Sequence, residues 1–303
     1  MDDAVALVAG NARVEVHAAV GGALASFAFG GIDVLRPTPV GTRDVRAHAC
    51  YPLVPYSNRI AEARLNFDGR AYGLARNFGD HPNAIHGVGW QWPWTIEAHD
   101  ATSALLTLDH EPAGGSALSW PWPIRAVQSL SLHADPTGAG ATLSLKLTIA
   151  NPGAAAFPFG LGWHPFFVRS AATRLGFRAG GVWETDATRL PTFHTVEPPQ
   201  RSFDPAREPG EATIDSVFTG WDGEATLVDA ERRIAVTLRA DSAMGFLVVY
   251  APENREFLAL EPVTHMTDAF NRAARGEGGT GARALRPGGA FSCTMQISVR
   301  PLP

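Results

Sequence analysis

The chain has 303 residues, of which 45% are hydrophobic and 18% charged, so it can bury a large core without external staples. Its formal net charge is −5, and it lacks the basic patch typical of a nucleic-acid-binding protein. The two cysteines, the acidic N-terminus and the absence of a run of about 18 apolar residues argue against a disulfide framework, a signal peptide and a membrane span. We therefore expect a cytoplasmic protein with neither a nucleic-acid nor a membrane partner.

Short segments in which apolar and polar residues alternate dominate the chain, and Gly, Pro, Asn or Asp bounds most of them, as is typical of β-strands. The first clear pair is a hairpin at Leu65–Leu74, whose central Asp68-Gly69 supplies the positive φ angles of a type I′ turn. Further strands are expected, in chain order, at Ser103–Leu108, Val127–Leu132, Ala141–Ile149, Arg233–Leu238, Phe246–Tyr250 and Thr294–Val299.

Helical periodicity is scarce, because 31 Gly and 23 Pro interrupt most windows that would carry it. A short helical turn is expected at Asp268–Ala274, with Thr267 or Asp268 as its cap. The Gly- and Arg-rich segment Arg272–Gly289 is expected to be a long loop, and strand-like residues resume after it. We predict a single all-β domain over residues 1–303, a large antiparallel β-sandwich with few short helices.

Four short segments place titratable side chains among apolar and aromatic residues. An ionisable group is costly to bury without a partner, and such groups tend to have shifted pKa values and to gather at functional sites. Each one alone can be a hydrogen-bonded structural residue, but four in one β chain indicate a shared pocket. The segments are Tyr51–Ile60 with Asn58 and Arg59, His81–Trp94 with His86, Phe157–Phe167 with His164, and Leu258–Phe270 with Glu261.

These residue types suit a sugar, because sugars present hydroxyl groups to polar side chains and weakly apolar CH faces to aromatic rings. No Gly-x-Ser-x-Gly elbow and no activated cysteine supports a nucleophilic triad. His81 and His86 belong to no compact ligand group, and the sequence has no glycine-rich phosphate loop. We therefore expect neither a metal nor a cofactor.

Taken in order, the motifs resemble those of the aldose 1-epimerase (galactose mutarotase) family. The resemblance runs from about Tyr51 to the C-terminus and implies the galactose mutarotase-like supersandwich. The residues around His164 and after Glu261 depart from the galactose-specific pattern, which leaves the sugar open. The segments that carry the resemblance are Asn58-Arg59-Ile60 with the hairpin after it, Asn83-Ala84-Ile85-His86-Gly87, Gly162-Trp163-His164-Pro165-Phe166-Phe167, Ile214-Asp215-Ser216-Val217-Phe218 and Leu260-Glu261-Pro262.

The resemblance implies a mutarotase, an isomerase that interconverts the α and β anomers of a free monosaccharide by acid–base opening and closing of the ring, without a cofactor. Glu261 would be the base, His164 the acid, and His86 would orient or polarise the ring oxygen or C1. The enzyme would act as a monomer or a homodimer. The substrate-binding residues would be Asn58, Arg59, Trp163 and Asp215.

Three alternatives stay open. Glu261 and Asp215 could form the carboxyl pair of a glycoside hydrolase, and a non-catalytic sugar-binding protein could have the same fold. A hexose-6-phosphate 1-epimerase would need a cationic clamp for the phosphate. The candidates for that clamp are Arg64, Arg70 and Arg76, on or near the predicted hairpin.

Overall fold

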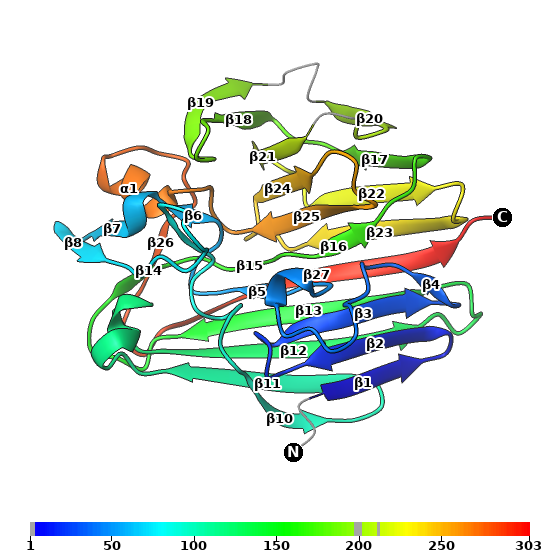
Figure 1. Cartoon of the computed structure of the whole chain (residues 1–303), viewed down its shortest axis with the longest axis horizontal. Coiled ribbons are helices and arrows are strands. Elements are labelled where there is room, and N and C mark those ends of the chain that lie inside the picture. The colour runs from blue at the N-terminus through cyan, green and yellow to red at the C-terminus, as the bar shows by residue number, and fades with distance from the viewer. Residues whose placement is uncertain (1–3, 197–201, 211–212) are drawn as a thin grey trace.

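The computed structural model describes residues 4–196, 202–210 and 213–303, and these form mainly β-strands (Figure 1). Met1–Asp3, the start of the N-terminal segment judged above not to be a signal peptide, lie outside the described residues. The largest sheet is antiparallel and has nine strands. In spatial order they are β10 (Thr95–His99), β11 (Ser103–His110), β12 (Ile124–Ala134), β13 (Ala141–Ala150), β27 (Ala290–Pro301), β23 (Ile234–Ala240), β22 (Glu224–Asp229), β17 (Thr173–Phe177) and β20 (Phe203–Arg207).

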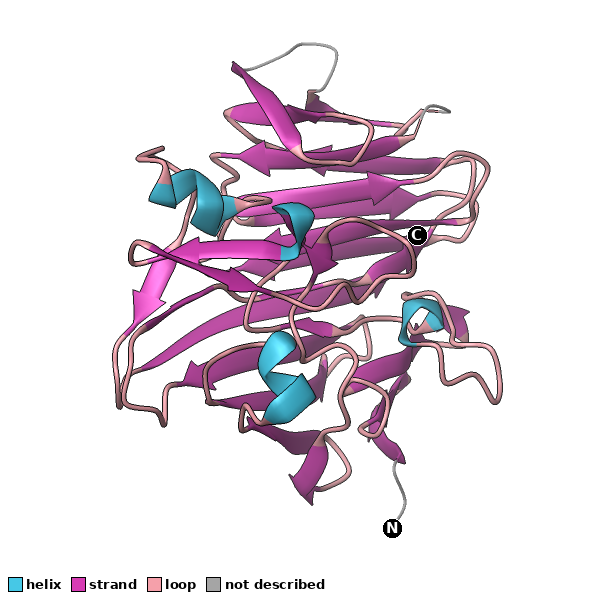
Figure 2. Cartoon of the chain, turned by 60° about the vertical axis from the view of Figure 1, so that its left-hand side comes forward, coloured by secondary structure: helices cyan, strands magenta, loops and turns pink. Residues whose placement is uncertain are grey.

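Two further antiparallel sheets accompany the nine-stranded sheet (Figures 1 and 2), and residues of all three form the main hydrophobic core. The smaller has the order β1 (Ala4–Ala9), β2 (Ala12–His17), β3 (Ala23–Phe29) and β4 (Ile32–Asp33). The larger has the order β19 (Pro191–Val196), β18 (Gly181–Thr185), β21 (Ile214–Thr219), β24 (Phe246–Ala251), β25 (Phe257–Val263), β15 (Gly162–Trp163) and β5 (Pro52–Leu53), with β16 (Phe166–Val168) also paired to β25. The predicted β-sandwich is confirmed.

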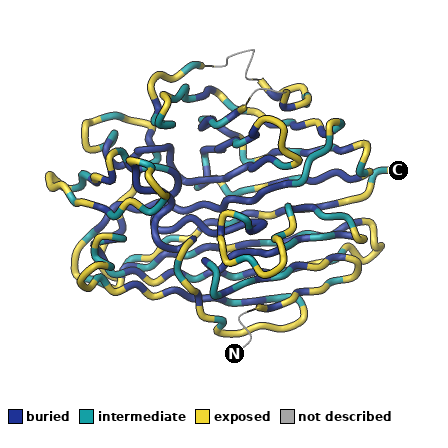
Figure 3. Tube along the Cα trace, in the orientation of Figure 1, coloured by how far each residue is buried: buried dark blue, intermediate teal, exposed yellow. Residues whose placement is uncertain are grey.

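The nine-stranded sheet buries one face and leaves the other open, so its strands alternate along the chain (Figure 3). In β13, Leu143, Leu145 and Leu147 are fully buried, whereas Lys146 between them is exposed. A strand with one solvated face keeps the period-2 pattern that sequence analysis detects. For this reason the strands expected at Ser103–Leu108, Val127–Leu132, Ala141–Ile149, Arg233–Leu238 and Thr294–Val299 all lie within or largely within strands of this sheet.

The eight-stranded sheet is buried on both faces in its central strands. In β25, Leu258 and Leu260 pack into the main core, while Ala259 belongs to a second apolar cluster on the other face. That second cluster also contains Tyr51 and Trp90, which the loops between the early strands bring over the sheet. The outer face of this sheet is therefore covered by loops, and its polar residues are enclosed.

The short elements beside this covered face include the predicted hairpin. It is confirmed as β7 (Arg64–Phe67) and β8 (Arg70–Gly73), with φ of 49° at Asp68 and 69° at Gly69, as a type I′ turn requires. The other short elements are β6 (Arg59–Ile60) paired with β9 (Ala84–Ile85), β14 (Phe157–Phe159) paired with β26 (Arg283–Leu285), the 3₁₀ helices Val45–Ala47, Ala61–Ala63 and Gly114–Leu118, and α1 (Ala269–Ala274).

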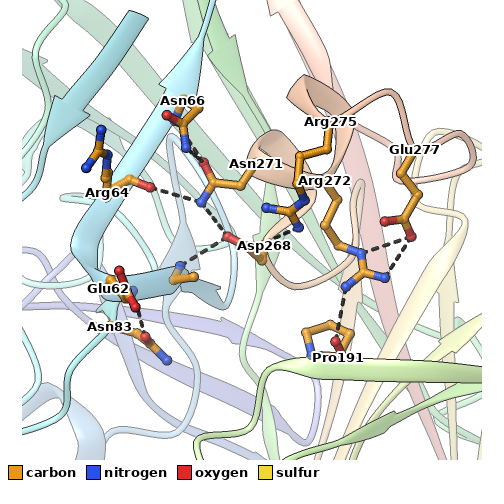
Figure 4. A network of polar contacts seen from close by, with 11 residues as sticks. Glu62, Arg64, Asn66, Asn83, Pro191, Asp268, Asn271, Arg272, Arg275 and Glu277 are labelled. Carbon is orange, nitrogen blue, oxygen red and sulfur yellow. Dashed lines mark hydrogen bonds and ion pairs between the residues drawn. The ribbon is translucent and has the colours of Figure 1, made fainter.

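Helix α1 confirms the predicted helical turn but not its cap. Asp268 occupies the position before the helix, yet its side chain accepts from the Ala61 backbone N–H at 3.1 Å and from Asn271 Nδ2 at 2.6 Å instead of capping. Figure 4 shows this network, in which Asn271 also reaches the backbone of β7. The helix therefore fixes the hairpin and the strand that carries Arg59.

Most of the segment Arg272–Gly289 is loop, as its composition predicted, but two parts of it are regular. It begins inside α1, and its residues Arg283–Leu285 form β26, which pairs with β14. The pairing partner lies more than 100 residues away in the chain, so composition alone could not indicate it. Both cysteines are buried and free. In the described part of the chain, no helix has the length and apolar character needed to cross a membrane.

Candidate active site

A cavity of about 400 Å³ lies on the covered face of the eight-stranded sheet. Six of the seven side chains predicted from sequence line it together, although they come from five different stretches of chain. They are Asn58, Arg59, His86, His164, Asp215 and Glu261.

Strand geometry explains how the sheet places its carboxyl groups. Successive residues of a strand point to opposite faces, so Glu261 lies on the same face of β25 as Phe257 and Ala259. Glu261 pairs with Val248 of β24, and the next residue of β24 on that face, Tyr250, pairs with Asp215 of β21. Three neighbouring strands thus direct their side chains into one cavity.

The turns beside β6 and β9 hold His86 in a single tautomer. The Asn58 backbone N–H donates to His86 Nδ1 at 2.9 Å, and the His86 backbone N–H donates to the Asn58 carbonyl at 2.9 Å. Because Nδ1 accepts a hydrogen bond, the neutral ring carries its proton on Nε2. Burial lowers the pKa of His86 well below its usual value, helped by the nearby His164 and Arg59. His86 is therefore a neutral hydrogen-bond donor.

The centre of the site is a buried contact between His164 Nε2 and Glu261 Oε1 at 3.1 Å. Glu261 is 3% exposed and His164 is 8% exposed. The imidazole stacks on Phe166 with 4.3 Å between ring centroids and lies 4.9 Å from the ring of Tyr51. These two rings pack against the imidazole and limit its orientations.

Several polar atoms of the site have no protein partner. Among the described residues, eight buried side-chain N or O atoms lack a hydrogen bond, and four of them belong to residues that line this cavity. Buried polar atoms are nearly always satisfied, so this concentration sets the cavity apart from the rest of the described interior. The four are Arg59 Nε, Trp90 Nε1, His164 Nδ1 and Glu261 Oε2.

Burial shifts both members of the pair toward their neutral forms. It raises the pKa of Glu261 well above its usual value, Asp215 adds to this effect, and Arg59 opposes it. It also lowers the pKa of His164, with a further contribution from the charge of Arg36. Burial therefore disfavours an ion pair between the two side chains.

One side of the cavity is charged, where Arg59, Arg189 and Asp215 lie near one another. Arg189 Nε lies 3.5 Å from Asp215 Oδ2, and Arg59 Nη1 donates to Asn58 Oδ1 at 3.2 Å. Burial raises the pKa of Asp215, while the charges of Arg59 and Arg189 oppose that shift. This side offers several charged and polar groups that can hydrogen bond to hydroxyls.

Sequence analysis missed several lining residues, including Arg36, Arg46, Arg189 and Tyr250. Arg36 follows the N-terminal sheet, and Arg189 belongs to a turn where its φ is 64°. Only the tertiary fold brings either residue to the cavity, so no local motif could have indicated them.

Trp163 does not line the cavity, at odds with its expected role in substrate binding. Its side chain is fully buried in the main core, and its Nε1 donates to Gln128 Oε1 at 3.1 Å. It is adjacent to His164 in the chain, and neighbouring residues of an extended segment point to opposite sides. The expected phosphate-clamp residues also lie elsewhere, since all three are exposed and none lines the cavity: Arg64, Arg70 and Arg76.

No group of three or more His, Cys, Asp or Glu residues that could hold a metal ion occurs in the described ranges. The chemistry of the cavity is instead that of one imidazole–carboxyl pair with hydrogen-bonding groups around it.

The fold and the cavity place the protein in the galactose mutarotase-like class of β-sandwiches. A putative aldose 1-epimerase from Escherichia coli K12 has a similar structure, with a TM-score of 0.88, 26% sequence identity and 99% of each chain covered. A galactose mutarotase-like protein from Clostridium acetobutylicum has the same fold, with a TM-score of 0.83 and 18% identity, over 99% of this chain and 95% of that one.

The chain belongs to the aldose 1-epimerase family, whose model matches residues 3–298. Among curated proteins it is 30% identical over 281 residues to the uncharacterized protein YihR of Escherichia coli, covering 88% of this chain and 85% of that protein. It is 28% identical over 259 residues to the uncharacterized protein YphB of the same organism, covering 83% of each chain.

Proposed function

We propose that the protein is a mutarotase, which interconverts the α and β anomers of a free sugar. The observation that carries the proposal is the buried His164–Glu261 contact with a free acceptor, Glu261 Oε2, on the same carboxyl group. Anomerisation needs a base at the C1 hydroxyl and an acid at the ring oxygen, and both oxygens are bonded to the same carbon. An acid and a base in direct contact match that spacing.

The reaction requires two proton transfers that reverse on ring closure. Glu261 Oε2 takes the proton from the C1 hydroxyl while His164 Nε2 gives a proton to the ring oxygen, the C1–O bond of the ring breaks, and C1 becomes a carbonyl. Rotation about C1–C2 exposes the other carbonyl face. The ring oxygen then attacks that face, returns its proton to His164, and Glu261 returns the other to O1.

The pair has one protonation form before ring opening and another after it, and each form carries one proton shared out differently between Glu261 and His164. Ring opening starts from carboxylate and imidazolium and ends with carboxylic acid and neutral imidazole, the form that burial favours. A bound sugar brings hydroxyl groups to Glu261 and to the unpartnered atoms around it, and these stabilise the charged form. The apolar surroundings thus bring the two forms close in energy.

The remaining polar groups suit substrate binding. His86 offers its Nε2–H as a donor close to the pair, since its ring centroid lies 5.6 Å from that of His164. Arg59 and Asp215 offer a donor and an acceptor to ring hydroxyls, as sugar recognition requires, and Asn58 supports Arg59.

Exchange spectroscopy of the anomeric protons tests the proposal, because it measures anomer interconversion at equilibrium. The purified protein is added to a panel of neutral, acidic and 6-phosphorylated sugars, and we expect faster α–β exchange for at least one of them. Buffer without protein gives the spontaneous rate. If the protein accelerates anomer exchange of none of these sugars, or if it instead releases reducing sugar from aryl glycosides, it is not a mutarotase.

A further inference from the structure

The cavity holds more positive than negative charge. Four arginines line it, against two carboxyl groups, and one of those carboxyl groups contacts His164. Asp44, just outside, holds Arg46 through Nη2 at 2.7 Å, and Asp215 lies beside Arg189. Arg36 has no such partner: no carboxylate in the described part of the chain forms an ion pair with it.

Arg36 is held in place by groups that carry no formal negative charge. Its Nη2 donates to the carbonyls of Arg46 and His48, at 2.6 and 3.0 Å. Its guanidinium carbon lies 4.0 Å from the ring centroid of Phe166 and 4.6 Å from that of Phe257. Its Nε and Nη1 have no acceptor among the described residues, so three N–H donors of a half-buried cation remain for a ligand. A cation at a partly desolvated position lowers the stability of the fold when no carboxylate pairs with it. Such a cation is therefore a candidate for binding an anionic ligand.

The position of Arg36 indicates which substituent of the bound sugar lies nearest to it. Phe166 contacts both Arg36 and His164, so Arg36 lies on the His164 side of the cavity. If His164 protonates the ring oxygen, as proposed above, the adjacent ring carbon C5 lies on that side as well. The exocyclic C6 group extends from C5. It is therefore the substituent nearest to Arg36.

We infer that Arg36 binds an anionic group, a carboxylate, sulfonate or phosphate, carried on C6 of the substrate sugar. The inference rests on the proposed function, and it deepens that function by naming the substrate class. It also links binding to the chemistry, because the charge of Arg36 disfavours a proton on His164, and an anion bound to Arg36 offsets this effect. Such an anion would therefore raise kcat as well as lower KM.

The test compares sugars that differ only at C6. Anomer exchange is measured by NMR for glucose, glucuronate, glucose 6-phosphate and the glucose 6-sulfonate analogue, and for the galactose series, each corrected for spontaneous exchange. We expect at least one anionic sugar to have kcat/KM about tenfold to a hundredfold above its neutral parent, as for a hydrogen bond to a charged group. That preference should fall as salt is added.

Variants assign the preference to Arg36. Arg36→Met is expected to bring the ratio of anionic to neutral kcat/KM close to one, and Arg36→Lys to restore part of it. Arg70→Met, which removes an exposed arginine of the hairpin, is expected to keep the wild-type ratio. A thermal melt shows whether each variant folds, and if Arg36→Met does not, the ratio in the wild-type protein decides alone.

The outcomes separate the two proposals. If neutral sugars exchange as fast as their anionic counterparts, or if Arg36→Met leaves the ratio unchanged, the inference is wrong and the mutarotase proposal stands. If no sugar of either kind exchanges faster than in buffer, the proposed function fails and this inference fails with it.

Discussion

Glu261 and Asp229 are carboxylates that the fold buries to nearly the same extent, 3% and 2% exposed, yet their surroundings differ. Asp229, at the end of β22, accepts four hydrogen bonds: two from Ser170, one from the Thr173 hydroxyl and one from the Arg232 backbone. Glu261 has one contact, to His164, and a second oxygen with no partner. The hydrogen bonds of Asp229 are therefore all made within the local structure, whereas one oxygen of Glu261 has none.

Their pKa values shift in opposite directions for this reason. Burial raises the pKa of both, but at Asp229 the hydrogen bonds from Thr173, Arg232 and Ser170 outweigh it and lower the pKa. At Glu261 nothing comparable offsets burial. The comparison teaches that burial alone does not mark a functional carboxyl group. A buried carboxyl group whose partners are missing does.

The largest effect is expected from removing the base. Glu261→Gln keeps the size and polarity of a protonated glutamate, so we expect the fold to be retained while kcat for anomer exchange falls about 10²- to 10⁴-fold. Exchange spectroscopy measures the rate and a thermal melt checks the fold. Near-wild-type exchange in this variant would remove Glu261 from the mechanism.

The opposite pattern is expected at the satisfied carboxylate. Asp229→Asn replaces a charged acceptor of several hydrogen bonds, so we expect the free energy of unfolding to fall by about 3 kcal/mol, with kcat of the folded protein unchanged. Asp109→Asn serves as a control, because Asp109 pairs with Arg125 on the surface, where the expected loss is below about 1 kcal/mol. Denaturant titration measures both. A loss of activity without a loss of stability in Asp229→Asn would invalidate the distinction.

The two carboxylates should also respond oppositely to pH. The pKa of Asp229 is lowered on folding, so its contribution to stability is present above about pH 4 and is lost as the pH falls through its folded pKa. The pKa of Glu261 is raised, so its contribution is fully present below about pH 4 and is lost as the pH rises toward its folded pKa.

Unfolding free energies of the two variants, each relative to wild type across pH, check these signs. The loss of unfolding free energy caused by Asp229→Asn should become smaller below about pH 4. Above about pH 4, the unfolding free energy of Glu261→Gln should rise relative to the wild type, by up to about 1.4 kcal/mol per pH unit. If Glu261→Gln instead lost stability relative to the wild type as the pH rose, Glu261 would be a charged partner of His164 in the protein without substrate.

The smallest effect is expected at Trp163. Trp163→Phe keeps most of the buried volume but leaves Gln128 Oε1 without its donor, so we expect a loss of about 1–2 kcal/mol in stability and a kcat/KM near that of the wild type. Denaturant titration and exchange spectroscopy measure the two quantities. A selective rise in KM would restore the substrate-binding role that the sequence predicted.

The features that the sequence predicted have local causes. The hairpin followed from Asp68-Gly69, and the strands of the nine-stranded sheet followed from one solvated face, because both signals lie within a few consecutive residues. Five of the six lining residues stand in the four short segments rich in apolar and aromatic residues, and Asp215 was indicated by the resemblance of its segment to a family motif. The structure adds that they share one cavity.

The features that the sequence did not predict depend on tertiary contacts. Arg36 reaches the cavity from the N-terminal sheet, and β26 forms only because β14 lies beside it. Trp163 was grouped with His164 because the two are adjacent, whereas adjacent residues of an extended segment face opposite sides. The alternation of side chains along an extended segment predicts that only one of Trp163 and His164 faces the cavity.

A double-mutant cycle on the His164–Glu261 pair tests the central claim most directly. Anomer exchange is measured for the wild type, Glu261→Gln, His164→Asn and the double variant, with the sugar that the wild type turns over fastest. If the two residues act as one acid–base unit, the double variant should be about as slow as the slower single variant, because removing either member already disables the pair. If the two losses multiply, His164 and Glu261 act independently, and their contact is not the catalytic unit.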